Sequence, residues 1–127
     1  MAIARKRMLC SDITEMDKFL DLPAKSQAIY FHLCMRADNN GFIDTASTLR
    51  CLRRTERCLE PLIRAGFIIR FPSGVVCITD WWVHNAPPKW DYALTVHMDE
   101  LLQLEVSETG RYFIPKRQRQ LEEAAGR

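Results

Sequence analysis

Two β-rich runs in the middle of the chain are separated by three residues that favour a turn. The runs cover residues 67–71 and 75–83, and Pro72-Ser73-Gly74 stands between them. Branched and aromatic residues favour strands, whereas Pro and Gly supply the backbone angles of a tight turn. The pattern predicts a β-hairpin over residues 67–83, and the rest of the chain must fold around it.

The longest helical pattern precedes this hairpin and spans about residues 24–37. Apolar residues recur in it at helical spacing, which predicts a face turned toward the core. That stripe consists of Ala24, Ala28, Phe31 and Met35, and Ile29 and Leu33 widen it. A shorter segment with helical spacing ends before Pro23, and its apolar residues are Ile13, Met16, Phe19 and Leu20. The long helix should stop at Asp38-Asn39-Asn40-Gly41, because glycine can adopt the left-handed conformation that ends many helices.

A short strand and two further helices are predicted between the long helix and the hairpin. Residues 42–43 suit a minimal strand, and a brief helix with Thr45 or Ser47 as its cap reaches Leu52. The second helix should run from about Thr55 to Ala65. It is expected to turn Leu59, Leu62 and Ile63 inward and to kink at Pro61, which lacks a backbone N–H.

The predicted order is therefore helix, short strand, helix, helix, strand, turn, strand. This is the order of a winged helix-turn-helix, an α+β fold that is mainly α and whose C-terminal β-hairpin forms the wing. In that fold the second helix of the turn enters the major groove of DNA and the hairpin flanks it. The order of elements is the first indication of a DNA-binding protein.

The character of the chain changes after Asn85. We expect a winged-helix domain over residues 1–85, a linker over residues 86–95 that contains two prolines, and a tail over residues 96–127. Apolar residues within 96–106 predict one short helix in this tail, and its end is polar and basic.

Six arginines gather between Ser47 and Pro72, where only Glu56 and Glu60 oppose them. They are Arg50, Arg53, Arg54, Arg57, Arg64 and Arg70. Residues 91–110 show the reverse pattern, with five acidic residues and no Lys or Arg. Because the net charge of the 127 residues is only +2, the clustering rather than the total charge points to a polyanion such as double-stranded DNA. The alternative for this cluster is an ordinary solvated helix face.

The six arginines have different expected roles in DNA binding. Arg53 and Arg54 stand at the entrance of the second helix and Arg57 one turn into it, where a helix N-terminus also attracts phosphate. Arg57 and Arg64 lie opposite the inward-facing leucines and should be exposed, although Arg64 could pair with Glu60 instead. Arg70 near the hairpin turn is expected to contact the DNA backbone. Arg50 could contact phosphate or pair with an acidic neighbour.

Trp81 and Trp82 fall in the last predicted strand, so alternation should turn one ring inward and the other outward. The outer ring could stack on a base, but packing of the tail or of a partner against it is the favoured interpretation. Trp90 and Tyr92 are expected on the same packing surface. We therefore expect either tail packing or a homodimer at this surface.

Cysteine and histidine spacing gives no sign of a metal, a disulfide or a catalytic pair. The five cysteines (Cys10, Cys34, Cys51, Cys58 and Cys77) are scattered, which predicts reduced and mostly buried thiols. None pairs with His32, His84 or His97 at zinc spacing, and the run 38–41 lacks the ligand spacing of a calcium loop. Glycine-rich phosphate loops and paired acidic motifs are also missing, so we expect no cofactor and no enzymatic activity.

The chain also lacks a membrane signal. No apolar run approaches the roughly 20 residues that span a bilayer. The basic start of the chain is followed by Asp12, Glu15 and Asp17, where a signal peptide would need an apolar core. We expect a cytoplasmic protein without a membrane partner.

Several of these segments together resemble a known family. They are Asp17-Lys18-Phe19-Leu20-Asp21-Leu22-Pro23, the run 26–42, Gly66-Phe67-Ile68-Ile69, Ser73-Gly74-Val75-Val76 and Trp82-Val83-His84-Asn85. In order and spacing, residues 5–95 resemble the N-terminal winged-helix domain of phage replisome organisers and DnaD-like replication initiation proteins. The resemblance implies DNA binding, self-association into a homodimer or higher oligomer, and contact with other replication proteins. Such proteins carry a further C-terminal region for helicase recruitment, which we expect this chain to lack.

The leading hypothesis from sequence is therefore the DNA-binding module of a phage-type replication initiator. One alternative is a winged-helix transcriptional regulator. Another is a protein–protein adaptor that binds no DNA, which the acidic segment and the paired tryptophans favour.

Overall fold

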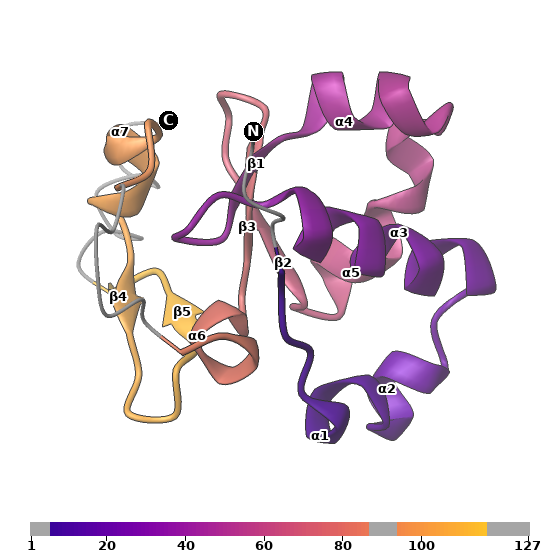
Figure 1. Cartoon of the computed structure of the whole chain (residues 1–127), viewed down its shortest axis with the longest axis horizontal. Helices are drawn as coiled ribbons and strands as arrows, with labels where there is room; N and C mark the ends of the chain where they lie inside the picture. Colours follow the sequence, from indigo (N-terminus) through magenta and orange to yellow (C-terminus); the bar gives the residue numbers. More distant parts are fainter. Residues whose placement is uncertain (1–5, 87–93, 117–127) are drawn as a thin grey trace.

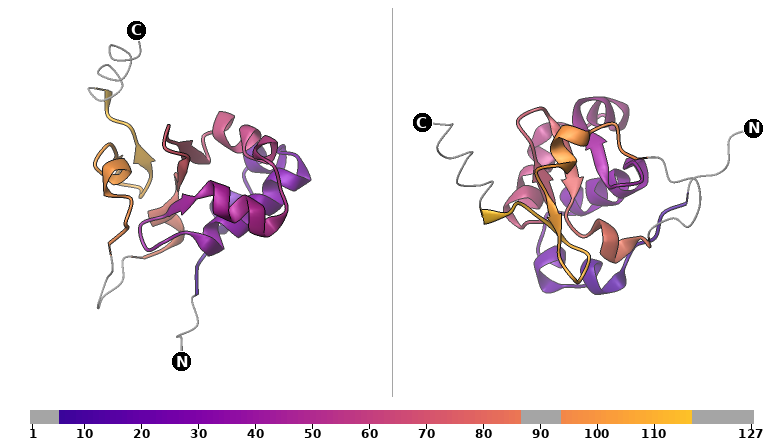
Figure 2. Two further views of the ribbon diagram at one scale, coloured as in Figure 1. Left: turned by 90° about the horizontal axis from the view of Figure 1, so that it is seen from above. Right: turned by 90° about the vertical axis from the view of Figure 1, so that its left-hand side faces the viewer.

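The computed structural model describes residues 6–86 and 94–116 of the chain. It is a mixed α/β structure with a small antiparallel sheet between a group of helices and a C-terminal segment (Figure 1). The two further views in Figure 2 show the same three parts, with the C-terminal segment on the side of the sheet away from the helices. The helical elements are α1 (Ser11–Thr14), α2 (Asp17–Leu20), α3 (Ala24–Arg36), α4 (Thr45–Leu52), the 3-10 turn η1 (Glu56–Cys58), α5 (Glu60–Arg64), α6 (Trp81–His84) and α7 (Met98–Leu101).

The sheet has the strand order β1-β3-β2 and is antiparallel throughout. Its strands are β1 (Phe42–Asp44), β2 (Ile68–Arg70) and β3 (Val75–Ile78). Cys77 in the central strand faces Phe42 on one side and Ile69 on the other. All four residues of β3 are buried, so the strand is covered on both faces. The short strand and the hairpin predicted from sequence are confirmed.

The buried face of α3 differs from the predicted stripe. Ser26, Ile29, Tyr30, Leu33 and Cys34 face the core, whereas Ala24, Ala28, Phe31 and Met35 are exposed. The prediction was right for Ile29 and Leu33 but wrong for the other four residues, because Tyr30 and Cys34 fill the core and Ser26 is buried beside them. The Ser26 hydroxyl donates a hydrogen bond to the carbonyl oxygen of Cys58 at 2.9 Å, which removes the cost of burying it.

The ends of the first helices also depart from the prediction. The single helix expected before Pro23 is two separate turns, α1 and α2, because Met16 between them is extended at φ −62° and ψ 144°. Only Ile13 and Phe19 are buried there. Helix α3 ends at Arg36 because Ala37 is extended, so Gly41 does not terminate it.

Gly41 instead makes room for a tryptophan. Its φ is +90°, and a Cβ atom at this position would lie 2.6 Å from Cγ of Trp81. The indole Nε1 of Trp81 donates a hydrogen bond to the carbonyl oxygen of Asn39 at 3.0 Å. The turn that follows α3 is thereby held over the buried Trp81 ring.

The predicted second strand of the hairpin is too long. Strand β3 ends at Ile78, and Trp81–His84 form the helical turn α6. The chain leaves the sheet at Asp80, whose carbonyl oxygen accepts hydrogen bonds from the N–H groups of Val83 and His84. Trp81 and Trp82 therefore lie on a helix rather than on a strand.

The C-terminal segment packs on the sheet. It contains α7 and a two-stranded sheet of β4 (Glu105–Val106) and β5 (Tyr112–Phe113). Leu104 and Tyr112 belong to the same hydrophobic core as the helices and β1–β3. The Tyr112 hydroxyl donates to the carbonyl oxygen of Asn40 at 2.7 Å, and its backbone N–H donates to that of Thr79 at 2.8 Å.

An ion pair adds to this attachment. Arg111 Nε lies 2.8 Å from Oδ1 of Asp80, whose side chain is 2 % exposed. The sequence prediction of one helix over residues 96–106 was too long, since α7 is a single turn and the β4–β5 hairpin follows it. Within residues 6–86 and 94–116, no helix combines the length and the apolar character that crossing a membrane requires.

Candidate nucleic-acid interface

Helix α4 presents one polar face to solvent and one face to the core. Thr45, Thr48 and Leu49 are buried, whereas Ser47 and Arg50 are exposed. The Thr45 side chain and N–H both donate to the carbonyl oxygen of Gly74, at 2.5 and 3.4 Å. Because Gly74 belongs to the turn between β2 and β3, this contact fixes the first turn of α4 beside the hairpin turn. Figure 1 shows α4 and that turn at the same upper edge of the molecule.

The connection after α4 is short and bent. Arg53 is the C-cap of α4 and adopts the left-handed conformation, with φ 56° and ψ 45°. Hydrogen bonds from the N–H of Arg53 to the carbonyl of Arg50 (3.2 Å) and from that of Arg54 to Leu49 (2.9 Å) close the turn. A residue other than glycine in this region costs about 1 kcal/mol or more. That cost indicates a connection held in place by its neighbours.

The second helix predicted over 55–65 is divided. Residues 56–58 form the 3-10 turn η1, and α5 begins only at Glu60, with Pro61 in its first turn. The predicted kink inside one helix was therefore wrong, since proline fits the first turn, where its missing N–H has no helical partner. Leu59 and Leu62 are buried as expected, and Ile63 is half-buried.

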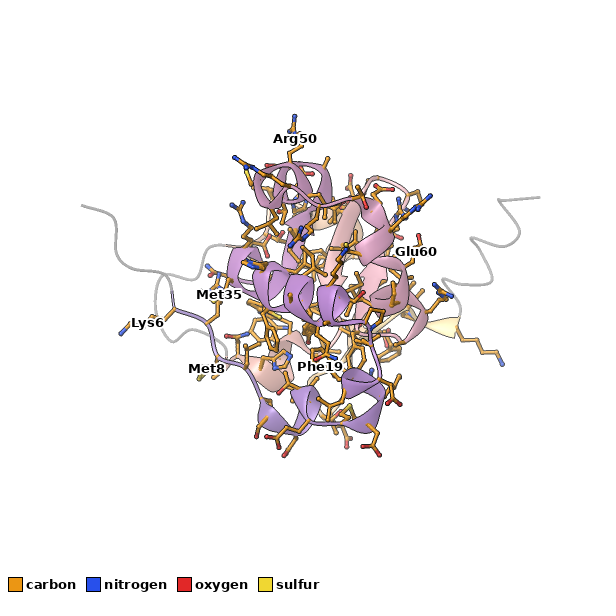
Figure 3. The ribbon with its side chains drawn as sticks, turned by 90° about the vertical axis from the view of Figure 1, so that its right-hand side faces the viewer. Lys6, Met8, Phe19, Met35, Arg50 and Glu60 are labelled. Carbon is orange, nitrogen blue, oxygen red and sulfur yellow. The ribbon has the colours of Figure 1, made fainter. Side chains whose placement is uncertain are left out.

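Five arginines of these elements point into solvent. Arg50, Arg53, Arg54, Arg57 and Arg64 are all exposed, and none forms an ion pair with another residue of the described ranges. Figure 3 shows Arg50 extending from the outer edge of α4. The predicted exposure of Arg57 and Arg64 is confirmed. Guanidinium groups without a carboxylate partner are available to phosphate oxygens or to guanine.

Arg70 differs from the other five arginines. Its Nη2 lies 3.1 Å from Oε2 of Glu56, and its Nη1 lies 3.6 Å from Oε1 of Glu60. Glu60 thus pairs with Arg70 across the sheet edge, whereas Arg64 was the partner considered from sequence. The two carboxylates offset the charge of Arg70, so we expect it to contribute less to phosphate binding than an unpaired arginine.

The turn of the β2–β3 hairpin contacts the C-terminal segment. The Ser73 hydroxyl donates a hydrogen bond to Oε1 of Glu100 at 2.8 Å, and Glu100 in α7 is buried. The turn itself, Pro72-Ser73-Gly74, carries no charged side chain. Little positive charge is therefore available at the tip of the hairpin.

The rings of Trp81 and Trp82 both make contacts within the folded chain. Trp81 is 1 % exposed, and the guanidinium carbon of Arg7 lies 5.2 Å from its ring centroid. Trp82 is half-buried, and its Nε1 donates to the hydroxyl of Tyr112 at 3.0 Å. The C-terminal segment therefore packs against Trp82, which leaves less of this ring for base stacking. Trp90 and Tyr92 lie outside the described residues, as do most of the expected linker and the end of the tail.

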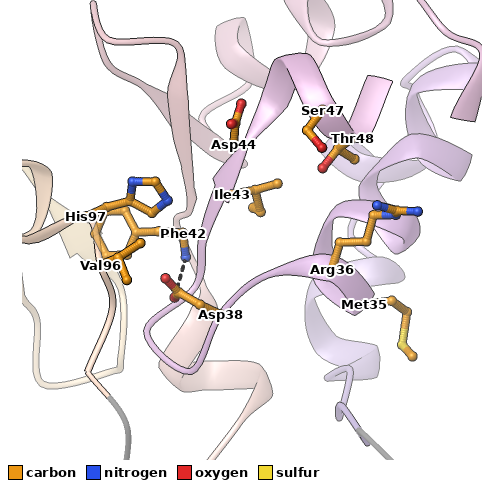
Figure 4. A pocket seen from close by; sticks show the side chains of 10 residues that line it. All are labelled: Met35, Arg36, Asp38, Phe42, Ile43, Asp44, Ser47, Thr48, Val96 and His97. Atoms are coloured by element: carbon orange, nitrogen blue, oxygen red, sulfur yellow. Dashed lines mark hydrogen bonds between the residues drawn. The ribbon is translucent and has the colours of Figure 1, made fainter. Parts of the chain in front are cut away.

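A hollow beside the first turn of α4 was not predicted (Figure 4). Arg36 at the end of α3 lies on one side of it and His97 on the other, with Ser47 and Thr48 at its upper edge. A basic residue close to two hydroxyl residues on a helix end could have signalled this site. Arg36 stands outside the run 47–72, however, and only the fold brings it to α4.

The thiols do not form a reactive centre. Cys34 and Cys77 are buried, Cys10 and Cys58 are half-buried, and Cys51 is exposed, so fewer thiols are buried than predicted. Burial raises the pKa of Cys34 to about 12 and that of Cys77 well above its ordinary value, so both remain protonated at neutral pH. Among the described residues, no three His, Cys, Asp or Glu side chains converge as metal ligands.

Comparison with known proteins adds no relative to these observations. No protein-family model matches the chain, and no curated protein or solved structure is detectably similar to it.

Proposed function

We propose that this chain is a winged-helix module that binds double-stranded DNA and acts in the initiation of phage-type replication. The proposal is carried by one observation, the five exposed arginines without ion-pair partners on α4, its connection and η1–α5. Like charges gathered on consecutive elements repel one another unless a polyanion neutralises them. DNA is the polyanion that suits arginines on a helix–turn–helix arrangement.

Two features of the fold support the winged-helix part of this proposal. In the sequence, α4 and α5 lie between β1 and β2, and the β2–β3 hairpin follows them. In the sheet, strand β3 of this hairpin lies between β1 and β2. The hydrogen bonds from Thr45 to Gly74 hold the hairpin turn beside α4. This position would allow α4 and the hairpin turn to contact one duplex together.

The proposed role in replication is more specific than DNA binding in general, and it rests on the family resemblance of residues 5–95. A transcriptional regulator with the same fold should strongly prefer a short palindrome. A replisome organiser should tolerate many sequences or prefer an origin. Competition between unrelated duplexes and a candidate origin distinguishes the two.

Fluorescence anisotropy with a labelled duplex of about 20 base pairs tests DNA binding. If about four arginines neutralise phosphates, the logarithm of affinity should fall with the logarithm of salt at a slope near −4. Raising the salt from about 50 to 200 mM should then weaken binding roughly a hundredfold. Changing Arg57 to Ala should cost about 1–3 kcal/mol and relax sequence preference if Arg57 contacts guanine.

The decisive variant replaces Arg53, Arg54 and Arg57 by alanine. Its matched control replaces Lys6, Lys25 and Lys116, three exposed lysines outside the elements that carry the arginines. Both lose the same charge, so a loss of affinity and of salt slope in the first variant alone assigns binding to the arginines. Absence of DNA binding even at low salt would contradict the proposal and favour the protein–protein adaptor.

A further inference from the structure

Arg70 joins the β2–β3 hairpin to both parts of the divided helix. It is the last residue of the edge strand β2, whereas Glu56 is the first residue of η1 and Glu60 is the first residue of α5. The two terminal nitrogens of Arg70 have different partners, because Nη2 lies 3.1 Å from Oε2 of Glu56 and Nη1 lies 3.6 Å from Oε1 of Glu60. One guanidinium group therefore holds two carboxylates that come from different elements.

These three side chains remain open to solvent. Arg70 is 38 % exposed, Glu56 is 61 % exposed and Glu60 is 49 % exposed. Exposed ion pairs contribute little to the free energy of unfolding. The main consequence of the contact is therefore a fixed direction for the two carboxylates, which long side chains would otherwise leave variable.

Each carboxylate keeps one oxygen that Arg70 does not contact. Oε1 of Glu56 and Oε2 of Glu60 make no hydrogen bond with the residues that the structure describes. An ionised carboxylate can only accept hydrogen bonds. The two oxygens are therefore acceptors for an amino group supplied from outside the chain.

The two carboxylates lie among the exposed arginines. Glu56 directly precedes Arg57 in η1. Glu60 stands four residues before Arg64, so these two side chains lie on the same side of α5. Figure 3 shows Glu60 at the outer edge of the molecule. A duplex that contacts the two arginines would therefore meet the carboxylates as well.

We propose that Glu56 and Glu60, positioned by Arg70, make the DNA site prefer cytosine, whose N4 amino group donates a hydrogen bond to a carboxylate oxygen in the major groove. This preference rests on the proposed function, since it requires duplex DNA at this face of the molecule. Arg70 is then a positioning residue and not a ligand of phosphate.

Cytosine suits a carboxylate better than the other groups of DNA. Phosphate oxygens and the O6 and N7 atoms of guanine are acceptors, so a carboxylate repels them. Adenine has an amino group, but its acceptor N7 lies beside that group and disfavours a carboxylate. A G·C base pair satisfies Glu56 and Arg57 together, because it offers a cytosine donor to the first and guanine acceptors to the second.

The base preference is measured with a library of duplexes whose central base pairs are randomised. The full chain is mixed with the library, and the bound and free duplexes are sequenced. The parent chain should enrich cytosine at one or two positions. A variant with Glu56→Ala and Glu60→Ala should lose this preference by about tenfold or more, while its mean affinity for the library does not fall. The matched control, Glu15→Ala with Glu108→Ala, removes two exposed carboxylates outside the elements that carry the arginines and should keep the preference.

Two variants of Arg70 test its positioning role. Arg70→Ala releases both carboxylates, so it should broaden the base preference and leave the dependence of affinity on salt unchanged. Arg70→Lys should restore part of the preference, because an ammonium group lacks the fork with which arginine reaches two carboxylates. Should Arg70→Ala fail to fold by circular dichroism, the double glutamate variant still decides the question.

The outcomes separate this proposal from the proposed function. Duplex binding without a cytosine preference, or with a preference that survives the loss of both glutamates, overturns the proposal and leaves the DNA-binding function intact. A salt slope that falls by about one in Arg70→Ala, at unchanged base preference, makes Arg70 a phosphate ligand and also overturns it. If the chain binds no duplex, the proposed function and the cytosine preference are both wrong.

Discussion

The hydroxyl of Tyr30 lies 2.6 Å from Nε2 of His84 in the core, where it joins α3 to α6. The other ring nitrogen, Nδ1, accepts a hydrogen bond from the backbone N–H of Cys10 at 2.8 Å. Because a backbone N–H can only donate, Nδ1 carries no proton, and the neutral ring donates from Nε2 to Tyr30. His84 therefore connects three parts of the chain only while it is uncharged.

The stability of the fold should consequently fall in mild acid. Burial lowers the pKa of His84, with Asp80 acting in the opposite direction. Below about pH 6.5, His84 is protonated in the unfolded chain but still neutral in the folded chain. The free energy of unfolding therefore decreases as the pH falls, until His84 is also protonated in the folded chain. Urea unfolding between pH 5 and 7.5 measures this. His84→Gln should lose that part of the pH dependence, while a change of the exposed His32 to Gln should keep it.

Gly41 and Gly74 provide a matched pair of substitutions. Both have φ near +90°, but a Cβ at Gly41 would strike Trp81, whereas nothing lies within 4 Å of one at Gly74. Gly74→Ala should cost about 1–2 kcal/mol for its backbone conformation. Gly41→Ala should cost about 1–3 kcal/mol more because of the overlap with the indole ring. Equal losses in chemical denaturation would show that Trp81 does not lie against this turn.

The attachment of the C-terminal segment can be tested on one strand. Tyr112 and Phe113 are neighbours in β5, but Tyr112 is 3 % exposed and Phe113 is 42 % exposed. Tyr112→Ala should reduce the free energy of unfolding by about 3–5 kcal/mol, as for other buried aromatic residues. Phe113→Ala should cost about 1 kcal/mol or less. A similar small effect of both changes would mean that the segment does not share the core.

Thiol reactivity should separate the cysteines by environment. Cys51 on α4 is exposed, whereas Cys34 is buried and its pKa is raised to about 12. Alkylation at pH 8 followed by mass spectrometry should label Cys51 first and Cys34 only as the protein unfolds. Cys51→Ala should abolish the fast phase. Rapid labelling of Cys34 in the folded protein would contradict its burial.

Local sequence patterns were sufficient to predict several parts of the fold. The helix over 24–36, the short strand at 42–44 and the hairpin around residues 72–74 depend on residues a few positions apart, and their spacing predicted them. The exposure of Arg57 and Arg64 followed in the same way from the apolar residues on the opposite side of the predicted helix, although the structure divides that helix into η1 and α5.

Tertiary contacts decided the rest. Helix α3 has two apolar stripes, and the one with Tyr30 became the core face because His84, 54 positions along the chain, satisfies its hydroxyl. Arg70 is held by Glu56 and Glu60, and Arg36 reaches the first turn of α4 only because β1 brings the chain back. The amino-acid sequence by itself determined where helices and strands can form, since that depends on neighbouring residues. Which polar side chains are satisfied and which remain available to a ligand depends on residues distant in sequence, and so only the folded chain determined the candidate sites.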